Sequence, residues 1–458
     1  LQQLLGRLEA VLSGANPQSV SNTLWAVATM GQQVPPLQLQ QLLGRLEAVL
    51  SGANPQSVSN TLWAVATMGQ QVPPLQLQQL LGRLEAVLSG ANPQSVSNTL
   101  WAVATMGQQV PPGQLQQLLD RLEAVLSGAK PQEMSMSLWA VATMGQLVPP
   151  RQLHLVLAAF QKLLPAADPQ HVANLLWACA KMQFLPLQLL QSLEQHPQQL
   201  QHLVAAANPH DLANMAWATG QLGYATQLLP GTLLQQAVKL LQIGGTGSFT
   251  PQHLCNLCWS AAVLDLQQCV PQVLQLAAAA GQVFSTISDQ ELQQLHQLYQ
   301  VHLWLLDSQL PTPGQGLSGV LTQQQLEQCR ASWEQQQTAR AKQQPSQMQQ
   351  SVYTAVLQLP HGTWQHQPQQ EQPTADKACL MDIAAVTASG VKVAIEVDGP
   401  HHHVQPDNAL TGPTLFRNRA LAARGYALIC IAYWEWRTLR SKGDQQHYLL
   451  DKLNSLGG

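Results

Sequence analysis

The chain has 458 residues, more than one ordinary hydrophobic core holds, so its length predicts two or three structural units. Charged residues make up only 10% and the formal net charge is −3, which excludes strong non-specific DNA binding. Single-stranded RNA stays open as a ligand, because stacking and base-edge hydrogen bonds share that recognition with charge. The seven cysteines are scattered through apolar stretches, which favours a reduced compartment. We expect no membrane-spanning helix, because no apolar run is long enough.

A tandem repeat with a period of 38 residues organises the first part of the chain. Residues 1–36 recur letter for letter at 39–74 and again at 77–112, and a diverged copy follows at 115–150. One Trp marks each of seven units, and we expect an eighth, degenerate helix pair over 268–307. The chain begins inside a repeat and without Met, so we expect it to be a fragment or processed form. The marker residues are Trp25, Trp63, Trp101, Trp139, Trp177, Trp217 and Trp259.

Each repeat predicts two helices. Asn54 followed by Pro55 is typical of an N-cap and a first helical position, and Gly69 and the proline pair 73–74 predict the end of that second helix. One such pair cannot bury its apolar face alone, so stacked pairs predict an α-solenoid. The first helix carries an apolar stripe at helical spacing, formed by Leu39, Leu42, Leu43, Leu46, Val49 and Leu50.

The repeat resembles the octotricopeptide repeat. The resemblance rests on the proline pair, the Leu-rich helix, the Asn-Pro-Gln start and the run Asn-Thr-Leu-Trp-Ala-Val-Ala-Thr-Met-Gly at 60–69, and it covers roughly residues 1–265. That family occurs mainly in green-algal organelles and is associated with sequence-specific RNA binding. The resemblance therefore implies an RNA-binding solenoid.

Two recurrent side chains of the second helix are candidates for RNA contact. The marker Trp is expected to pack between helices, with stacking on a base as the alternative. An Asn lies three residues before the Trp in six of the seven units, and Met136 interrupts the series. A mid-helix Asn needs a reason, either a hydrogen-bonded bridge between repeats or the reading of a base edge. The asparagines are Asn22, Asn60, Asn98, Asn174, Asn214 and Asn256.

Arginines recur with the same period on the first helix. In a solenoid they would form a one-sided ladder suited to phosphates, and the alternative is pairing with the glutamate two residues later. If each repeat reads one base, three identical repeats must read the same base three times. The candidate arginines are Arg7, Arg45, Arg83 and Arg121.

The composition changes twice after the repeats. Residues 307–350 are rich in Gln, Ser, Pro and Gly and predict a linker, with an exposed Gln-rich helix over 321–344 as the alternative. Beyond 351, the pattern predicts strands at 380–386, 392–397 and 426–433 and helices at 414–424 and 444–453, with a turn at Ser389-Gly390. These elements form a small α/β domain.

The C-terminal residues resemble the RAP domain, an RNA-associated module. The resemblance rests on Ala-Ile-Glu-Val-Asp-Gly-Pro-His-His at 394–402, Gly-Pro-Thr at 412–414, and Ile-Ala-Tyr-Trp-Glu-Trp at 431–436. Three consecutive histidines point in different directions, so we expect an RNA contact there and no metal site. The paired cysteines Cys255 and Cys258 are expected to be buried thiols. The RNA-binding candidates of this domain are His401, His402, Arg417, Arg419 and Arg424.

RAP domains resemble restriction-endonuclease folds, which implies an enzymatic alternative. Asp382 and, on the next strand, Glu396 and Asp398 would place carboxylates side by side for Mg²⁺. The nuclease pattern ends in Glu-x-Lys, whereas this chain has Asp398 in place of that Lys. Lys392, four residues before Glu396, is the candidate substitute.

The sequence as a whole predicts a mainly α protein. We expect an α-solenoid over 1–306, a Gln/Pro-rich linker over 307–350 and a restriction-endonuclease-like RAP domain over 351–458. The predicted function is sequence-specific binding of single-stranded RNA in chloroplast or mitochondrial RNA processing, stability or translation, with no cofactor and no catalytic group. Partners would include RNA-processing or ribosomal proteins. The alternatives are a repeat-guided, Mg²⁺-dependent endonuclease and a protein-binding helical scaffold.

Overall fold

The structure is a computed structural model that describes residues 13–287, 292–308 and 315–457. The chain divides into two compact units. One comprises residues 1–182 and 186–199, and the other comprises residues 183–185 and 200–458. Arg7 lies outside the described residues. Across the described part of the chain, no helix combines the length and apolarity needed to cross a membrane.

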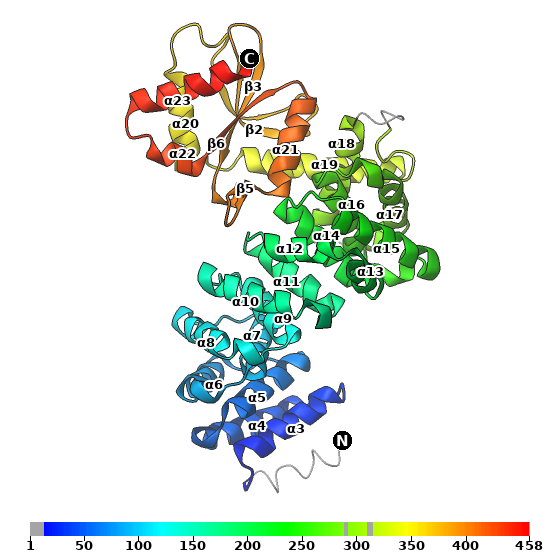
Figure 1. Cartoon of the computed structure of the whole chain (residues 1–458), viewed down its shortest axis with the longest axis vertical. Helices are drawn as coiled ribbons and strands as arrows, with labels where there is room; N and C mark the ends of the chain where they lie inside the picture. Colours follow the sequence, from blue (N-terminus) through cyan, green and yellow to red (C-terminus); the bar gives the residue numbers. More distant parts are fainter. Residues whose placement is uncertain (1–12, 288–291, 309–314, 458) are drawn as a thin grey trace. The chain divides into compact units, whose positions relative to one another are not determined.

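The first unit is an array of helix pairs, as predicted (Figure 1). We call the first helix of each repeat the A helix and the second the B helix. Consecutive B helices pack directly on one another. The B helices are α3 (Pro17–Thr29), α5 (Pro55–Thr67), α7 (Pro93–Thr105), α9 (Pro131–Thr143) and α11 (Pro169–Lys181). The A helices are α4 (Pro36–Ala48), α6 (Pro74–Ala86), α8 (Pro112–Ala124), α10 (Pro150–Lys162) and α12 (Leu187–Gln195). Short 3₁₀ turns join A to B at η1 (Leu50–Gly52), η2 (Leu88–Gly90), η3 (Leu126–Gly128) and η4 (Leu164–Ala166).

The predicted start and stop residues lie at the ends of these helices. Asn54 Oδ1 accepts a hydrogen bond of 2.8 Å from the backbone N–H of Ser57, and Pro55 is the first residue of α5. Gly69 follows the helix with φ +66°, a left-handed conformation that favours glycine. Leu39, Leu42, Leu43 and Leu46 are buried in α4 as predicted, whereas residues 49 and 50 follow its end and are half-buried.

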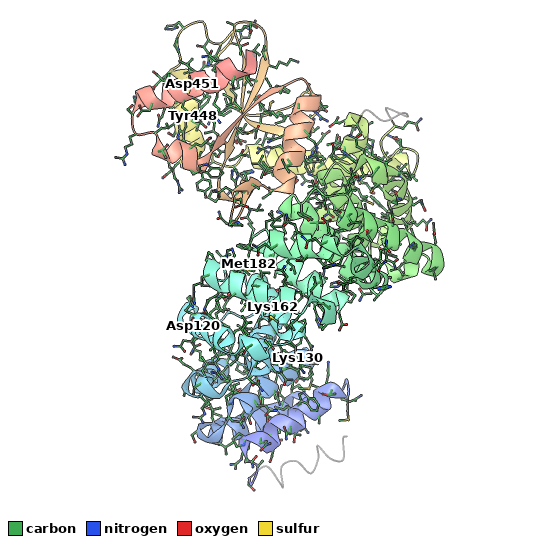
Figure 2. All side chains as sticks on the ribbon, viewed as in Figure 1. Asp120, Lys130, Lys162, Met182, Tyr448 and Asp451 are labelled. Carbon is green, nitrogen blue, oxygen red and sulfur yellow. The ribbon has the colours of Figure 1, made fainter. Side chains whose placement is uncertain are left out.

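Glutamine side chains cross-link neighbouring repeats. Gln70 Nε2 donates to the carbonyl of Val34 at 2.6 Å, and Gln108 repeats the contact one unit later on Val72 at 3.0 Å. In the diverged fourth repeat, Asp120 accepts hydrogen bonds from two glutamines, one of them in the next repeat (Figure 2). The uncharged polar side chains therefore donate hydrogen bonds to backbone carbonyls that have no partner at the bends between helices.

The second unit begins with more repeats. Successive helices α14, α16, α18 and α19 pack on one another, so the predicted eighth pair is present as α17 and α18. The helices are α13 (Pro197–Ala205, which spans the boundary), α14 (Pro209–Leu222), α15 (Leu228–Gly244), α16 (Pro251–Val263), α17 (Val270–Gln282), α18 (Leu292–Asp307) and α19 (Gln323–Ala341), with turns η5 (Thr246–Ser248), η6 (Gln267–Cys269) and η7 (Phe284–Thr286).

The prediction of a linker over 307–350 is wrong for most of the residues that the structure describes in this range. Residues 323–341 form α19, which packs on α18. Residues 347–350 are the first residues of the next helix, which extends to residue 357. Leu326, Cys329 and Trp333 form a narrow apolar stripe at helical spacing within a Gln-rich segment, and all three are buried. Trp333 Nε1 also donates to the carbonyl of Ala378 at 2.9 Å. The average composition concealed this stripe.

The chain ends in an α/β domain whose sheet has the strand order β1-β2-β3-β6. The first three strands are antiparallel, and β3 pairs in parallel with β6. The predicted strands and helices are confirmed, except that residue 433 begins α22 and does not end the third strand, whereas β1, β4, β5, α20 and α22 were not predicted. The elements are α20 (Gln347–Leu357), β1 (Gln369–Pro373), β2 (Leu380–Val386), β3 (Lys392–Asp398), η8 (Pro400–His402), β4 (His403–Val404), β5 (Ala409–Leu410), α21 (Gly412–Ala423), β6 (Ala427–Ala432), α22 (Tyr433–Thr438), α23 (Lys442–Asn454) and η9 (Ser455–Gly457).

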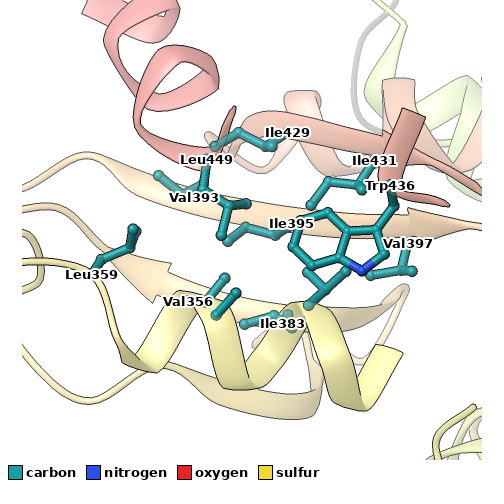
Figure 3. Packing of buried hydrophobic residues seen from close by; sticks show 12 residues of the cluster. Val356, Leu359, Ile383, Val393, Ile395, Val397, Ile429, Ile431, Trp436 and Leu449 are labelled. Carbon is teal, nitrogen blue, oxygen red and sulfur yellow. The ribbon is translucent and has the colours of Figure 1, made fainter. Parts of the chain in front are cut away.

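One apolar cluster holds this domain together (Figure 3). Ile383, Ile395 and Ile431 of the sheet meet Val356 of α20 and Trp436 of α22, and all five are buried. The alternation of apolar residues along β2 places this face inward, as a half-buried strand requires. The domain has its own core.

Helix α21 docks the α/β domain onto the last repeats. It contacts α14, α16 and α18. Arg419 Nη2 donates to the carbonyls of Ala262 and Val263 at 3.0 and 2.6 Å, at the C-terminal end of α16. The backbones of Gly220 and Gly412 approach so closely that a Cβ at residue 412 would clash with the Gly220 carbonyl oxygen. The repeats and the α/β domain of this unit therefore form one packed body.

Gly412→Ala is expected to lower the free energy of unfolding of this unit by about 1–3 kcal/mol, because the added methyl group forces backbone apart. Denaturant unfolding followed by tryptophan fluorescence measures the loss. Gly82→Ala is the matched control, since a Cβ there meets nothing within 4 Å and alanine favours a helix. Equal stability of the two variants would contradict the close packing.

Candidate nucleic-acid interface

Each B helix presents one polar stripe. On α5, Gln56, Asn60, Trp63 and Thr67 are exposed or half-buried, whereas most other residues of the helix are buried. Their spacing of four, three and four residues keeps them on one helical face. We call these positions the B-helix stripe. In the first unit it continues as Gln18, Asn22, Trp25 and Thr29; Gln94, Asn98, Trp101 and Thr105; Gln132, Met136, Trp139 and Thr143; and Gln170, Asn174, Trp177 and Lys181.

The stripe tryptophans contact one another. The indole centroids of Trp25 and Trp63 are 6.5 Å apart, and those of Trp63 and Trp101 are 6.3 Å apart, with planes tilted by 35° and 34°. Trp139 and Trp177 repeat the arrangement at 6.3 Å. The prediction of core packing is thus correct in part, since most of these rings are half-buried and Trp25 is 45% exposed. The exposed edges of these indoles offer a stacking surface beside amide and hydroxyl groups.

The predicted asparagines differ in their contacts. Asn256 Oδ1 accepts a hydrogen bond of 2.9 Å from Gln297 Nε2 on α18, which is the bridge between repeats that the sequence predicted. Asn214 Nδ2 lies 3.2 Å from His210 Nε2 of its own helix. Asn22 is exposed, Asn60 and Asn174 are half-buried on the stripe, and Asn98 is buried, with 8% of its surface exposed. A structural bridge therefore accounts for one position, and a role in reading bases stays a prediction for the others.

The recurrent arginines make a contact that sequence reasoning missed. Arg45, Arg83 and Arg121 donate from Nε to the carbonyls of Ala15, Ala53 and Ala91, each 30 residues earlier, at 2.9, 2.8 and 2.7 Å. The expected partner Glu47 instead accepts from Gln79 of the next repeat at 2.9 Å. These hydrogen bonds between repeats account for the recurrence of the arginines without any contact to RNA. Binding of RNA phosphates by the row of arginines stays a prediction.

In the second unit the stripe positions lead to a cleft. Trp259 Nε1 donates to Gln300 Oε1 of α18 at 2.8 Å. A cleft of about 820 Å³ is lined by parts of α19, α20, β2, β3 and α21 and by two glutamines of the repeats. They are Gln300 and Gln221, and Gln221 takes the position on α14 that Thr67 takes on α5. The arginines of the cleft wall are Arg340, Arg417 and Arg437, its histidines are His401 and His402, and its acidic residues are Glu371, Asp382 and Glu396. We call this the α19 cleft.

Arg417 joins the predicted carboxylates. Its guanidinium lies 3.0 Å from Glu396 Oε2 and 2.9 Å from Asp398 Oδ1, and both carboxylate side chains are 1% exposed. Asp382 Oδ2 accepts from the Val397 backbone N–H at 2.7 Å, and its Oδ1 accepts from Gln349 Nε2 at 2.9 Å. Burial raises the pKa of Glu396 to about 8 against the opposing pull of Arg417. Sequence reasoning brought these residues together correctly but assigned Arg417 to RNA.

This arrangement does not fit the Mg²⁺ site of the nuclease alternative. The guanidinium of Arg417 takes the place between Glu396 and Asp398 where a cation would need their oxygens. Among the described residues, no group of three or more His, Cys, Asp or Glu side chains is arranged to hold a metal. Lys392 is exposed at the start of β3, with its Nζ 6.0 Å from the Tyr426 ring, and lies about 13 Å along the strand from Glu396. The expectation that Lys392 supports these carboxylates is wrong.

The unfolding free energy is expected to fall as pH rises from about 6.5 to 8. Burial raises the pKa of Glu371 to about 7 and that of Glu396 to about 8, so the folded chain still holds protons that the unfolded chain has released. Burial lowers the pKa of His253 and His402 to about 4, so these side chains take up protons only on unfolding, and their opposing effect fades above their ordinary pKa of about 6.5. Melting curves across the window measure the slope, which Glu396→Gln should make shallower. A flat wild-type profile would contradict the assignment.

The histidine run divides into three roles. His401 is exposed, and its carbonyl accepts from Gln183 Nε2 at 2.8 Å. His402 Nδ1 lies 3.0 Å from Thr414 Oγ1 and 3.6 Å from Asp398 Oδ1. His403 is buried against Trp434, with ring centroids 4.4 Å apart. Only His401 and His402 reach the α19 cleft, so their predicted RNA contact stays consistent with the geometry.

Arg419 and Arg424 serve internal contacts. Arg419 docks α21 on α16, as described above. Arg424 pairs with Asp307 at 2.8 Å and with Asp376 at 2.7 Å, and its side chain is 13% exposed. Sequence reasoning treated both as free cations because their partners lie 48 to 157 residues away. It missed Arg340 and Arg437, exposed cations of the cleft wall, because only the tertiary fold brings them together.

Comparison with known proteins identifies one segment. Residues 395–452 match the family model of the RAP domain. A similar curated protein is "RAP domain-containing protein, chloroplastic" from Oryza sativa subsp. japonica, which is 36% identical over 58 residues. The match spans 13% of this chain and 9% of that protein. The RAP resemblance of the C-terminal residues is confirmed, whereas the octotricopeptide character of the repeats stays a prediction.

Proposed function

We propose that the chain binds single-stranded RNA along the B-helix stripe, with the RAP-like domain extending the binding surface. The observation that carries the proposal is the series of half-buried indoles flanked by Asn, Gln and Thr side chains. Aromatic faces stack on any base, and amides and hydroxyls contact base edges. Recognition of this kind does not depend on a strongly basic surface, which a chain with a net charge of −3 lacks.

We further propose that the RNA is an organellar transcript and that the repeats belong to the octotricopeptide type. The RAP match supports a role with RNA, and the chloroplastic relative favours the chloroplast over the mitochondrion. A bound solenoid blocks exonucleases or opens a hairpin without chemistry, so processing, stability or translation of a transcript follows from binding alone. RNA-processing or ribosomal proteins are the expected partners.

Selection from a random RNA pool at about 0.15 M salt tests the proposal, because non-specific phosphate binding is already weakened there. The stripe residues of the first three repeats are identical, so the enriched motif should contain one nucleotide three times in succession. If every pool binds weakly even at low salt, a protein-binding scaffold replaces the proposal. The exposed leucines Leu37 and Leu75, 64% and 68% exposed on A helices, would then be the first contacts to test.

A further inference from the structure

The α19 cleft contains two buried polar atoms without a hydrogen-bond partner among the described residues. They are Nε2 of Gln337, in a residue that is 5% exposed, and Oε1 of Glu396, in a residue that is 1% exposed. Both residues line the cleft. An unsatisfied buried polar group is unfavourable, so two in one cleft indicate a site that a ligand completes.

The same cleft has an aromatic surface and a cationic rim. Tyr433 is half-buried, and the guanidinium of Arg437 lies 5.2 Å from its ring centroid. Arg340 is exposed in the last turn of α19, on the same cleft. An aromatic ring, unpaired polar atoms and cations in one cleft match the base, the base edge and the phosphate of a nucleotide.

The B-helix stripe of the second unit reaches this cleft. Gln221 and Gln300 belong to the wall, and Gln300 accepts from the stripe indole of Trp259. Trp259 itself is only 5% exposed, so a strand would approach the cleft over the half-buried Gln221 and Gln300 and not over this indole. The volume of about 820 Å³ falls within the range of about 300–1,000 Å³ typical of small-molecule sites.

We propose that the α19 cleft takes up one nucleotide of the bound RNA strand, with its base edge on Gln337 and Glu396 and its phosphate on Arg340 and Arg437. This inference rests on the proposed function. Gln337 Nε2 donates to an acceptor of the base. Burial raises the pKa of Glu396 to about 8, so at neutral pH its acid group also has a proton to donate. The cleft fixes the register of the strand on the repeats.

The test uses the full chain with oligo(A), oligo(C) and oligo(U), and separately with the four nucleoside monophosphates. Gln337→Leu and Glu396→Leu, which leave no donor or acceptor at these positions, are each expected to lower affinity for the preferred oligonucleotide about tenfold, the effect of one lost hydrogen bond to a base. Gln335→Leu, an exposed residue of the same helix, is the control and should bind as the wild type does. Melting curves confirm that each variant is folded.

An abasic nucleotide moved along the preferred oligonucleotide gives the second readout. One abasic position should lower wild-type affinity about tenfold and should lower Gln337→Leu affinity no further, because both changes remove the same contact. Oligonucleotide binding that neither variant changes would overturn the cleft site and leave RNA binding by the stripe in place. Monophosphate binding that requires Gln337, without oligonucleotide binding, would instead show a free-nucleotide site and overturn both proposals.

Discussion

Replacing Trp63 and Trp101 together by leucine is expected to weaken RNA binding about a hundredfold, because each base stacked on an aromatic ring contributes about 1–3 kcal/mol. Leucine keeps the apolar contacts between B helices but offers no ring face. The two indoles lie 6.3 Å apart on consecutive repeats, so one strand would lose two adjacent contacts. Fluorescence anisotropy with the selected RNA measures the change.

Leu37→Ala/Leu75→Ala is the matched control for this pair. Both leucines are large, exposed and in neighbouring repeats, but they lie on A helices, away from the stripe. The control should retain wild-type affinity. If both double variants bind the RNA equally well, the indoles do not contribute to binding and the stacking proposal is wrong.

Replacing Arg417 by alanine is expected to destabilise the second unit by about 3–5 kcal/mol, because the carboxylate of Asp398 stays buried without its counter-charge and Glu396 loses its partner. Equilibrium unfolding in denaturant measures the loss. Arg330→Ala is the control: its pair with Glu327 is about half exposed on both sides, so at most about 1 kcal/mol should be lost.

A neutral replacement separates this structural role from RNA contact. Arg417→Met combined with Glu396→Gln and Asp398→Asn removes all three charges and should recover most of the lost stability. If Arg417→Ala unfolds at the wild-type denaturant concentration, the ion-pair cluster is not what holds this part of the domain. That result would instead support the prediction from the sequence that Arg417 is available to bind RNA.

The same cluster bears on the nuclease alternative. The sequence identified Asp382, Glu396 and Asp398 as neighbours, and pairing of β2 with β3 confirms this. It could not show that Arg417, one helix later, reaches between two of them. A carboxylate cluster neutralised by a guanidinium stabilises the domain interior, whereas a metal site would need those oxygens free.

Local patterns determined much of this protein in advance. The 38-residue period, the Asn-Pro starts and the glycine ends are decided within a few residues, because caps and left-handed glycines act on the nearest backbone. The helix pairs, the eighth pair and the strands 380–386 and 392–397 therefore followed from the sequence. The RAP resemblance likewise lay in short contiguous runs.

The tertiary structure alone decided how side chains distant in sequence are paired. Arg45 reaches Ala15, Arg424 reaches Asp307, and Trp333 reaches Ala378 across 45 residues, so no local pattern distinguishes these groups from free surface residues. The helix at 323–341 was predicted only as an exposed alternative to a linker, because three apolar residues bury a segment whose average composition is that of a linker. The sequence determined what each segment forms, since that depends on near neighbours. Which cations remain available to RNA depends on the fold, because burial and pairing are properties of the packed chain.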